Sequence, residues 1–294
     1  MTNVYFAIPG DINTRTGGYA YDRRLIAELH LRGCKLKHLP LSNKFPTPDA
    51  PAIAETETLL AQLPEGAVVI IDGLAFGVMA ELAERHQHRL RLIALCHHPL
   101  MLEAGLSSEQ VQSLFHSEQR ALNAAQAVIV TSAMTRSILI EQFAIPAAKI
   151  SVAEPGTDRQ NFARCGGNPP VLLTIATLTR RKAHDVLIDA LAQVQHLPWT
   201  ARFAGGMDFD LEWSALLHQK VKAYGLEERI IFTGMIIDTA REYAAADVFV
   251  LPSLFEGYGM AFAEALSFGL PVIAARAGAV ADLVPATAGI LVPP

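Results

Sequence analysis

Residues 248–284 read VFVLPSLFEGYGMAFAEALSFGLPVIAARAGAVADLV, a pattern typical of a strand, a turn, a helix and a second strand. The apolar run Asp247–Leu251 predicts a buried strand. A helical pattern begins after the two glycines of EGYG, and the apolar run Pro271–Ala274 predicts the next strand. A strand, a crossover helix and a parallel strand form one βαβ unit, so this stretch predicts a parallel α/β sheet.

The start of this helix is a predicted phosphate site, because unpaired N–H groups and the positive end of the helix dipole favour an anion there. Glu256 precedes the helix, and Glu264 lies about 12 Å further along at helical rise. Two carboxylates around a phosphate site suit a ligand with hydroxyls at both ends and a diphosphate between them, as in a nucleotide sugar. A solvated helix face is the alternative for the two glutamates, but the turn glycines and flanking strands favour the site.

Size and composition limit the possible classes of protein. The chain has 294 residues, of which 51% are hydrophobic and 18% charged, so it can form two α/β domains or one large one. The net charge of −5 gives no electrostatic reason to bind nucleic acid. The cysteines are few and far apart, which predicts reduced thiols in a cytoplasmic protein without structural zinc; they are Cys34, Cys96 and Cys165.

The first ten residues lack the pattern of a signal peptide and predict a first strand instead. No uncharged apolar run reaches about 18 residues, so the sequence predicts no membrane span. Peripheral contact with the inner face of a membrane stays open.

Two motifs in the first half fall where open α/β sheets bind ligands. Gly17-Gly18 begins a predicted helix after the first strand, where glycines let a ligand approach the backbone, although a simple tight turn is equally consistent. His97 and His98 follow the predicted strand Leu90–Leu95. Either histidine could instead satisfy loop backbone. No third ligand is spaced nearby, so a metal site is not predicted.

Two helices of the first half are also predicted. One spans Phe76–His88. The other spans Ser107–Ala124, with apolar residues on one side and Ser107 as its cap. Glu118 of this helix is expected to be solvated.

A domain boundary is predicted where the regular pattern breaks. The stretch Arg159–Pro170 is polar and irregular, and its Pro169-Pro170 end predicts a stiff join. The predicted domains are residues 1–167 and 168–294. Shortly afterwards, Arg180, Arg181 and Lys182 fall at a predicted strand-to-helix turn. A helix N-terminus disfavours cations, so these residues suggest a bound anion, with an incidental basic surface as the alternative.

These motifs resemble one family. Pro252–Glu264, PSLFEGYGMAFAE, matches the E-x7-E motif of the retaining glycosyltransferases of family 4, which have the GT-B fold of two facing, doubly wound, Rossmann-like α/β domains. Ala176–Leu187 is similar to the segment that carries the family's donor-phosphate lysine. The resemblance extends over nearly the whole chain and includes Phe203–Gly206, Phe232–Gly234, Gly278–Val284, Gly17-Gly18 and His97-His98-Pro99.

The resemblance implies a role for each matching residue. Lys182, with Arg181, would neutralise the donor diphosphate. Glu256 would hold hydroxyls of the transferred sugar, and Glu264 those of the ribose. The other implied donor-site residues are Tyr258, Gly259 and Met260 at the phosphates, Gly17 and Gly18 where the N-terminal domain closes, Gly234 near the base, and His97 or His98 at the anomeric carbon.

The implied activity is a retaining hexosyl transfer from a UDP- or GDP-linked sugar to a sugar or lipid-linked acceptor, without metal, in polysaccharide or glycolipid assembly. Two departures bear on it. Thr177 stands where the family often has arginine, and the sequence ends at LVPP, where family members continue with further helices, so we expect a truncated form. A non-catalytic sugar-binding protein and a nucleotide-sugar epimerase or hydrolase are the alternatives.

Overall fold

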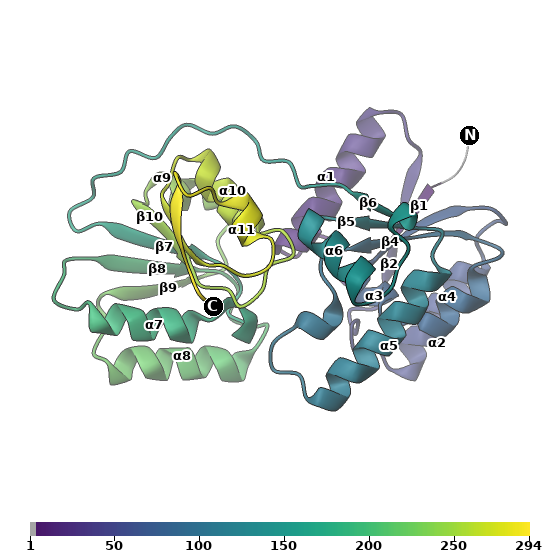
Figure 1. The fold of residues 1–294 in the computed structure, drawn as a ribbon, viewed down its shortest axis with the longest axis horizontal. Coiled ribbons are helices and arrows are strands. Elements are labelled where there is room, and N and C mark those ends of the chain that lie inside the picture. Colours follow the sequence, from purple (N-terminus) through teal and green to yellow (C-terminus); the bar gives the residue numbers. More distant parts are fainter. Residues whose placement is uncertain (1–3) are drawn as a thin grey trace. The chain divides into compact units, whose positions relative to one another are not determined.

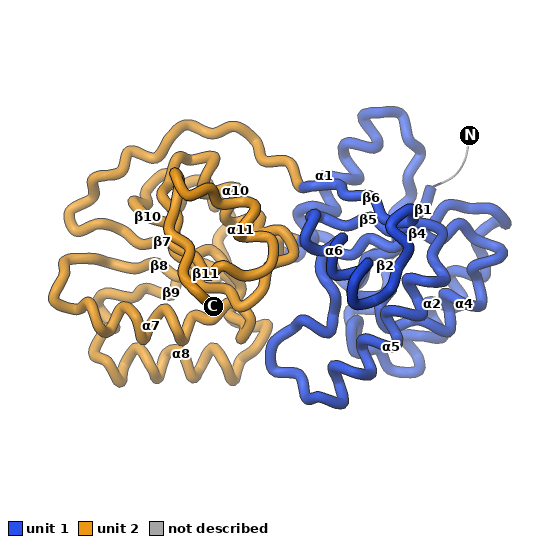
Figure 2. Tube along the Cα trace, in the orientation of Figure 1, with its two compact units in different colours: residues 1–14, 18–154 blue, residues 15–17, 155–294 orange. Residues whose placement is uncertain are grey.

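The computed structural model describes residues 4–294 and divides the chain into two compact units (Figure 2). Of the described residues, unit 1 contains 4–14 and 18–154, and unit 2 contains 15–17 and 155–294. Each unit is built on a six-stranded parallel sheet. The predicted α/β class with two doubly wound domains is therefore confirmed.

In unit 1, coloured purple to teal in Figure 1, the strands lie in the order β2-β1-β3-β4-β5-β6. Their bounds are β1 Val4–Pro9, β2 Leu36–Leu41, β3 Val68–Asp72, β4 Arg91–Cys96, β5 Ala127–Val130 and β6 Ile150–Val152. The helices of this half are α1 Gly17–Leu31, α2 Ala50–Ala61, α3 Gly73–Phe76, α4 Ala80–His86, α5 Ser108–Ala124 and α6 Ala133–Glu141, with short 3-10 turns η1 Leu100–Leu102 and η2 Ala147–Lys149.

In unit 2 the strands lie in the order β12-β11-β10-β7-β8-β9. Their bounds are β7 Val171–Ile175, β8 Thr200–Ala204, β9 Ile230–Gly234, β10 Val248–Leu251, β11 Val272–Ala275 and β12 Gly289–Val292. The helices are α7 His184–Gln193, α8 Leu211–Ala223, α9 Thr239–Ala244, α10 Met260–Ser267 and α11 Val280–Leu283, with a 3-10 turn η3 Arg180–Lys182 before α7.

The strand order of each sheet reverses at one point. In unit 2 the reversal lies between β7 and β10, and in unit 1 it lies between β1 and β3. Open α/β sheets bind ligands outside the carboxyl ends of the strands at such a switch point, because the connections leave in opposite directions there. The topology alone therefore selects the loops after β7 and β10 as the ligand-binding region of unit 2.

The position of β10 inside the sheet explains why residues 248–251 are all apolar. Phe249 and Leu251 point into a core cluster with α10, whereas Val250 points into the cluster on the other face with Trp213 of α8. A parallel strand that is covered on both faces needs apolar side chains at successive positions. This central stretch has the predicted strand, turn, helix and strand.

The predicted helix Phe76–His88 is correct only in part: α4 occupies Ala80–His86 within it, whereas α3 already ends at Phe76. Gly77 ends α3 where the backbone comes close to neighbouring side chains. A Cβ at Gly77 would lie 2.8 Å from Leu100 Cδ1 and 3.3 Å from Glu118 Cδ. The chain then leaves the helical conformation at Met79, with φ −121° and ψ 41°.

The compact units divide after Glu154, earlier than the boundary predicted after residue 167. The irregular segment between these points packs on unit 2. The backbone N–H of Ala163 donates to the carbonyl oxygen of Phe268 at 2.7 Å, and Asp247 accepts from the N–H groups of Gly167 and Val171 at 2.8 and 2.7 Å. The segment has an irregular sequence, but these hydrogen bonds attach it to unit 2. Composition alone does not predict this attachment.

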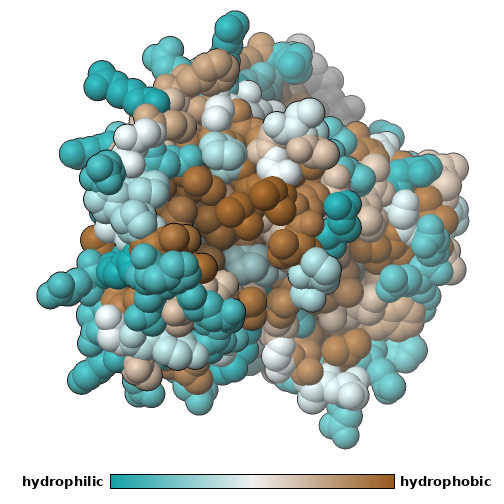
Figure 3. Space-filling model, turned by 60° about the vertical axis from the view of Figure 1, so that its left-hand side comes forward, coloured by the Kyte–Doolittle hydropathy of each residue, from teal (hydrophilic) through white to brown (hydrophobic). Residues whose placement is uncertain are grey.

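Some apolar side chains remain accessible, and one face of the molecule shows an apolar area bordered by hydrophilic side chains (Figure 3). In unit 2, Ile273 of β11 pairs in register with Ile290 of the edge strand β12, and their side chains are 38% and 65% exposed. This side of β11 and β12 is thus left uncovered by residues 4–294. Over the same residues, none of the helices combines the length and the apolar character that crossing a bilayer requires.

Candidate functional site

The cations and the glutamate predicted to bind the donor come together at the switch point of unit 2. Lys182 Nζ donates to Glu256 Oε1 at 2.6 Å, and Arg181 Nη1 lies 3.4 Å from Glu256 Oε2. Arg181 also donates to the carbonyl oxygen of Phe255 at 2.7 Å. The turn after β7 and the turn after β10, far apart in sequence, therefore form one charged cluster at the carboxyl edge of the sheet.

Burial strengthens the electrostatic attraction between the charged side chains of this cluster. The side chains of Arg181, Lys182 and Glu256 are 14%, 15% and 8% exposed. Burial alone would raise the pKa of Glu256, but Lys182 and Arg181 outweigh it and hold that pKa below its ordinary value. Glu256 is therefore an ionised, nearly buried acceptor between two cations.

The cations do not stand at the start of α7, as the sequence suggested. They form the 3-10 turn η3, and Ala183, with φ 51°, separates this turn from α7. Arg180 turns toward α8, where its guanidinium lies 3.4 Å from Asp210 and 4.8 Å from the centre of the Trp213 ring. Arg181 is consequently the arginine that accompanies Lys182 at the site.

Two glycines shape the turn that carries Glu256. Gly259, which follows Tyr258, has φ 99° and directly precedes α10, so that the helix begins at Met260. Gly278 packs against the backbone of Glu256, and a Cβ there would lie 2.2 Å from the Glu256 carbonyl oxygen. Gly278 was not predicted to belong to the site, although its place in GAVADLV is the signal that marks it.

The other predicted donor residues of unit 2 occupy distinct places. Glu264 lies on α10, where burial raises the pKa of its carboxyl and the hydroxyl of Tyr243 opposes that rise. Gly234 ends β9 with φ 69°, and its carbonyl oxygen accepts from the N–H of Gly205 at 3.0 Å. Glu264 follows the turn of Glu256, whereas Gly234 lies at the end of the edge strand β9, beside β8.

In unit 1 the structure separates the two histidines. His97 directly follows β4, and its Nε2 lies 3.3 Å from Asp22 Oδ1 and 3.4 Å from Asp72 Oδ2. His98 Nε2 instead lies 2.6 Å from Glu103 Oε1. A Cβ at Gly18 would lie 3.6 Å from His97 Nε2, so Gly18 and His97 are neighbours. Gly17 is the first residue of α1.

The sequence missed both carboxylates beside His97. The prediction that no third ligand lies near the histidines was based on spacing along the chain and is wrong in space. Asp22 comes from α1 and Asp72 from the end of β3, and parallel topology brings both to His97. Burial raises the pKa of Asp22 to about 6, against the opposing effect of His97. Burial would lower the pKa of His97, but the two carboxylates raise it to about 10.

Glu118 is a second correction in unit 1, since it is buried and not solvated. Its Oε2 accepts from the N–H of Leu100 at 2.9 Å. Burial raises its pKa to about 8, although the Leu100 N–H and Cys96 oppose that rise. A neutral carboxyl thus holds the turn that follows His97 and His98.

Comparison with known proteins places the chain in a family. A model described as "Glycosyltransferase Family 4" matches residues 19–161, and one described as "Glycosyl transferases group 1" matches residues 169–294. The chain belongs to glycosyltransferase family 4. The predicted family is therefore confirmed, and its two models together account for most of both units.

Curated relatives of this family 4 chain match part of it. It is 31% identical over 166 residues to mannosylfructose-phosphate synthase of Agrobacterium fabrum, which covers 50% of the chain and 37% of that relative. It is 32% identical over 184 residues to a GDP-mannose-dependent alpha-(1-6)-phosphatidylinositol monomannoside mannosyltransferase of Mycolicibacterium smegmatis, covering 55% of the chain and 47% of that relative. The matches thus span less than half of these relatives.

Solved structures show the same GT-B fold. Sucrose-phosphate synthase of Thermosynechococcus elongatus has a TM-score of 0.81 at 22% identity, over 100% of this chain and 86% of that one. Anabaena HepE in complex with UDP and glucose has a TM-score of 0.71 at 22% identity, over 98% of this chain and 85% of that one. At this identity the likeness establishes the fold of the family 4 chain and nothing finer.

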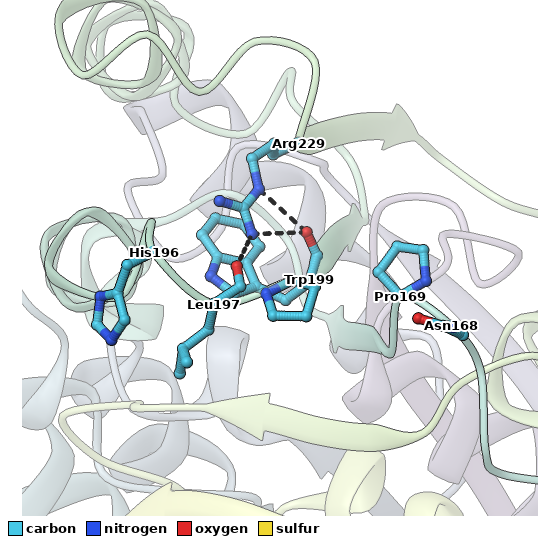
Figure 4. Close-up of a pocket in the computed structure, with 7 residues that line it drawn as sticks. Asn168, Pro169, His196, Leu197, Trp199 and Arg229 are labelled. Carbon is cyan, nitrogen blue, oxygen red and sulfur yellow. Dashed lines mark hydrogen bonds between the residues drawn. The ribbon is translucent and has the colours of Figure 1, made fainter.

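A surface hollow elsewhere in unit 2 has a structural role (Figure 4). It has a volume of about 450 Å³ and is lined by residues that precede β7, β8 and β9, at the sheet edge opposite Lys182. Arg229 stacks 3.6 Å from the centre of the Trp199 ring and donates to the carbonyl oxygens of Gln195, Leu197 and Trp199. Arg229, the cation that lines this hollow, is already engaged by backbone oxygens, so the hollow is not a donor site of the family 4 chain.

Proposed function

We propose that the chain transfers a sugar from a nucleotide-diphosphate sugar to an acceptor hydroxyl, with retention of configuration at the anomeric carbon. The observation that carries the proposal is the contact of Lys182 and Arg181 with Glu256 at the switch point of unit 2, at 2.6 and 3.4 Å. Family membership supports the same reaction.

The charges of this cluster match the two ends of the bond that breaks. Cleavage of a glycosyl–phosphate bond leaves negative charge on the diphosphate and builds positive charge on the sugar. Lys182 and Arg181 neutralise the departing diphosphate, together with the first N–H groups of α10. Glu256 accepts hydrogen bonds from hydroxyls of the transferred sugar. Because the cations and the carboxylate are already fixed by one another, little reorganisation accompanies the reaction.

The remaining roles follow from position. Glu264, on α10, holds the ribose hydroxyls, and Gly234 borders the base. Of the two histidines, His97 is the one that serves the sugar, because His98 is directed to Glu103 at 2.6 Å. Gly18, beside His97, leaves room for the donor to approach.

The donor and acceptor classes are drawn from the relatives. One relative is named as GDP-mannose-dependent, and HepE was solved with UDP-glucose. A UDP- or GDP-linked hexose is therefore the proposed donor. Relatives that act on a phosphatidylinositol mannoside or in lipopolysaccharide core biosynthesis favour a sugar or lipid-linked acceptor in polysaccharide or glycolipid assembly. The proposed setting is the cytoplasmic side of the membrane.

Calorimetric titration with UDP and with GDP tests the phosphate role. We expect Lys182→Ala to weaken nucleotide binding at least tenfold, which corresponds to about 1.4 kcal/mol. Lys220→Ala is the matched control, because Lys220 also pairs with a carboxylate, Asp189, at 2.6 Å, but on α8. Equal affinity of wild type and Lys182→Ala would overturn the assignment.

Turnover with a panel of nucleotide sugars tests the reaction itself. Transfer to an acceptor, with the product anomer assigned by NMR, is the expected result. Release of free sugar or of an epimer would instead identify a hydrolase or an epimerase. Binding without turnover would identify a sugar-binding protein.

A further inference from the structure

Tyr243 is a buried tyrosine of α9 whose hydroxyl reaches α10. It is 1% exposed and belongs to the core cluster that contains residues of β10 and α10. Its ring stacks on Phe268 with 5.3 Å between the ring centres, and it is tilted against the ring of Phe249 at 5.9 Å. These two aromatic neighbours fix the direction in which the hydroxyl points.

The hydroxyl of Tyr243 meets two groups of α10. It donates a hydrogen bond to the carbonyl oxygen of Ala261 at 3.0 Å, and it also interacts with the carboxyl of Glu264. Ala261 and Glu264 lie on the same side of α10, because residues at positions i and i+3 of a helix are neighbours. A tyrosine hydroxyl carries one hydrogen, which it can direct to either acceptor.

The contact favours a charged glutamate. Burial and the charge of Glu264 raise the pKa of Tyr243 well above its ordinary value, so the hydroxyl keeps its hydrogen and acts as a donor. Burial also raises the pKa of Glu264, and the hydroxyl of Tyr243 opposes that rise. Tyr243 thus stabilises the ionised form of a half-buried carboxyl, which is the form that accepts the stronger hydrogen bonds.

A glutamate that binds a ligand from a helix gains from such a support. Its side chain has several rotatable bonds, and ordering them at the moment of binding opposes that binding. A carboxylate that the protein already holds avoids this loss, and its orientation decides which ligand groups it meets. The hydroxyl of Tyr243 is itself held by the aromatic core, so it can hold Glu264 in one orientation.

We propose that Tyr243 is a positioning residue, which orients the carboxylate of Glu264 toward the ribose hydroxyls of the donor nucleotide. This inference rests on the proposed function, from which it takes the ribose role of Glu264. Tyr243 acts through Glu264, because its own side chain is enclosed by the core of unit 2. The inference gives α9, the helix between β9 and β10, a part in nucleotide binding.

The preference for ribose tests this role. Calorimetry compares UDP or GDP, whichever the wild type binds more tightly, with its 2′-deoxy analogue, which lacks one of the hydroxyls assigned to Glu264. We expect Glu264→Ala to reduce the preference for the ribonucleotide about tenfold, and Tyr243→Phe about threefold. Tyr224→Phe is the matched control, because it also removes a hydroxyl that donates to a carboxylate, Asp189 Oδ1 at 2.8 Å, but at the end of α8.

Combining the two substitutions separates positioning from packing. Tyr243→Phe keeps the ring and its aromatic contacts, so the variant should fold as the wild type does, which thermal unfolding checks. If the hydroxyl acts through Glu264, the double variant should bind the ribonucleotide no more weakly than Glu264→Ala alone. Losses that multiply in the double variant would overturn the inference.

The pH profile is a readout that a packing role would not move. Glu264 binds ribose as a carboxylate, so the preference for the ribonucleotide should fall as pH falls through the pKa of Glu264. Without the hydroxyl of Tyr243 that pKa is higher, so the fall should occur at higher pH in Tyr243→Phe than in wild type.

Two kinds of failure are distinguishable. If the wild type prefers the ribonucleotide, but Tyr243→Phe has the same preference or the same pH profile as wild type, the inference is overturned and the proposed function stands. If the wild type binds neither UDP nor GDP, the proposed function is overturned, and the inference falls with it.

Discussion

The carboxyl group of Glu118 accepts a hydrogen bond from the backbone N–H of Leu100 at 2.9 Å, from inside the unit 1 core. Glu118 lies on α5, and Leu100 begins the turn η1 that follows His97 and His98. Because α5 is anchored by a capping box at Ser107, it offers a rigid support for that turn. A single buried acid thus connects a helix to the loop that carries both histidines.

This acid makes stability depend on pH. The pKa of Glu118 is about 8 in the folded chain and near 4.5 when exposed. As pH rises, the carboxyl of Glu118 therefore loses its proton in the unfolded state at a lower pH than in the folded state. The free energy of unfolding should therefore fall as pH rises from about 5 to 8 and level off above. The unfolding free energy of Glu118→Gln, measured with urea, should not show this fall between pH 5 and 8. Glu109→Gln, in the first turn of the same helix, should show it as wild type does. Identical pH profiles for Glu118→Gln and wild type would refute the assignment.

Glu256→Gln separates the sugar role from the phosphate role. The amide removes the negative charge but leaves Lys182 and Arg181 in place, so UDP or GDP should bind at least as tightly as to wild type. We expect kcat for transfer to fall by about 100-fold, as for other preorganised polar groups at a reacting centre. Glu242→Gln is the control, because its carboxylate pairs with Arg202 at 2.6 and 2.9 Å. A loss of nucleotide affinity equal to the loss of kcat would contradict the division of roles.

Gly278→Ala should damage the turn that carries Glu256. Gly278 and Gly225 both have positive φ, 58° and 64°, but only Gly278 is crowded. Gly225→Ala should cost about 1–2 kcal/mol of unfolding free energy for backbone conformation alone. Gly278→Ala should cost about 1–3 kcal/mol more, because its Cβ meets the Glu256 carbonyl oxygen. Thermal unfolding measures the loss of unfolding free energy in both variants. Equal losses in Gly225→Ala and Gly278→Ala would contradict the close approach of Gly278 to the backbone of Glu256.

Substitution of His97 and substitution of His98 should change the kinetics of sugar transfer to different extents. His97→Ala should lower kcat strongly, since His97 is the residue held between two carboxylates next to Gly18. His98→Ala should have a smaller effect, through the loss of its contact with Glu103. Steady-state measurement of kcat and KM for both variants shows which histidine serves the sugar. A larger loss of kcat in His98→Ala than in His97→Ala would reverse the assignment.

Most of the fold could be predicted from local pattern. The strands of both sheets are short apolar runs between turn residues, and β10 is apolar at successive positions because both faces are covered. The break between α3 and α4 could not be found this way. At this break Gly77 approaches Leu100 and Glu118 closely, and both of these residues are distant in sequence.

The site of unit 2 could be predicted better than that of unit 1. Glu256, Gly259 and Glu264 lie within one βαβ unit, so spacing along the chain reports their proximity. Asp22 and Asp72 reach His97 only through the order of parallel strands, which leaves no local signature. Glu118 did leave a signal, because it lies four residues from both Leu114 and Leu122, on the apolar side of α5.

Arg229 has a consequence for sequence variation in related proteins. Its guanidinium spans three backbone oxygens while stacking on Trp199. Lysine carries the same charge but offers one compact ammonium, which can neither cover a ring nor reach three acceptors in a plane. A homologue with lysine at this position would have to rebuild the loop before β8, so the two changes should occur together.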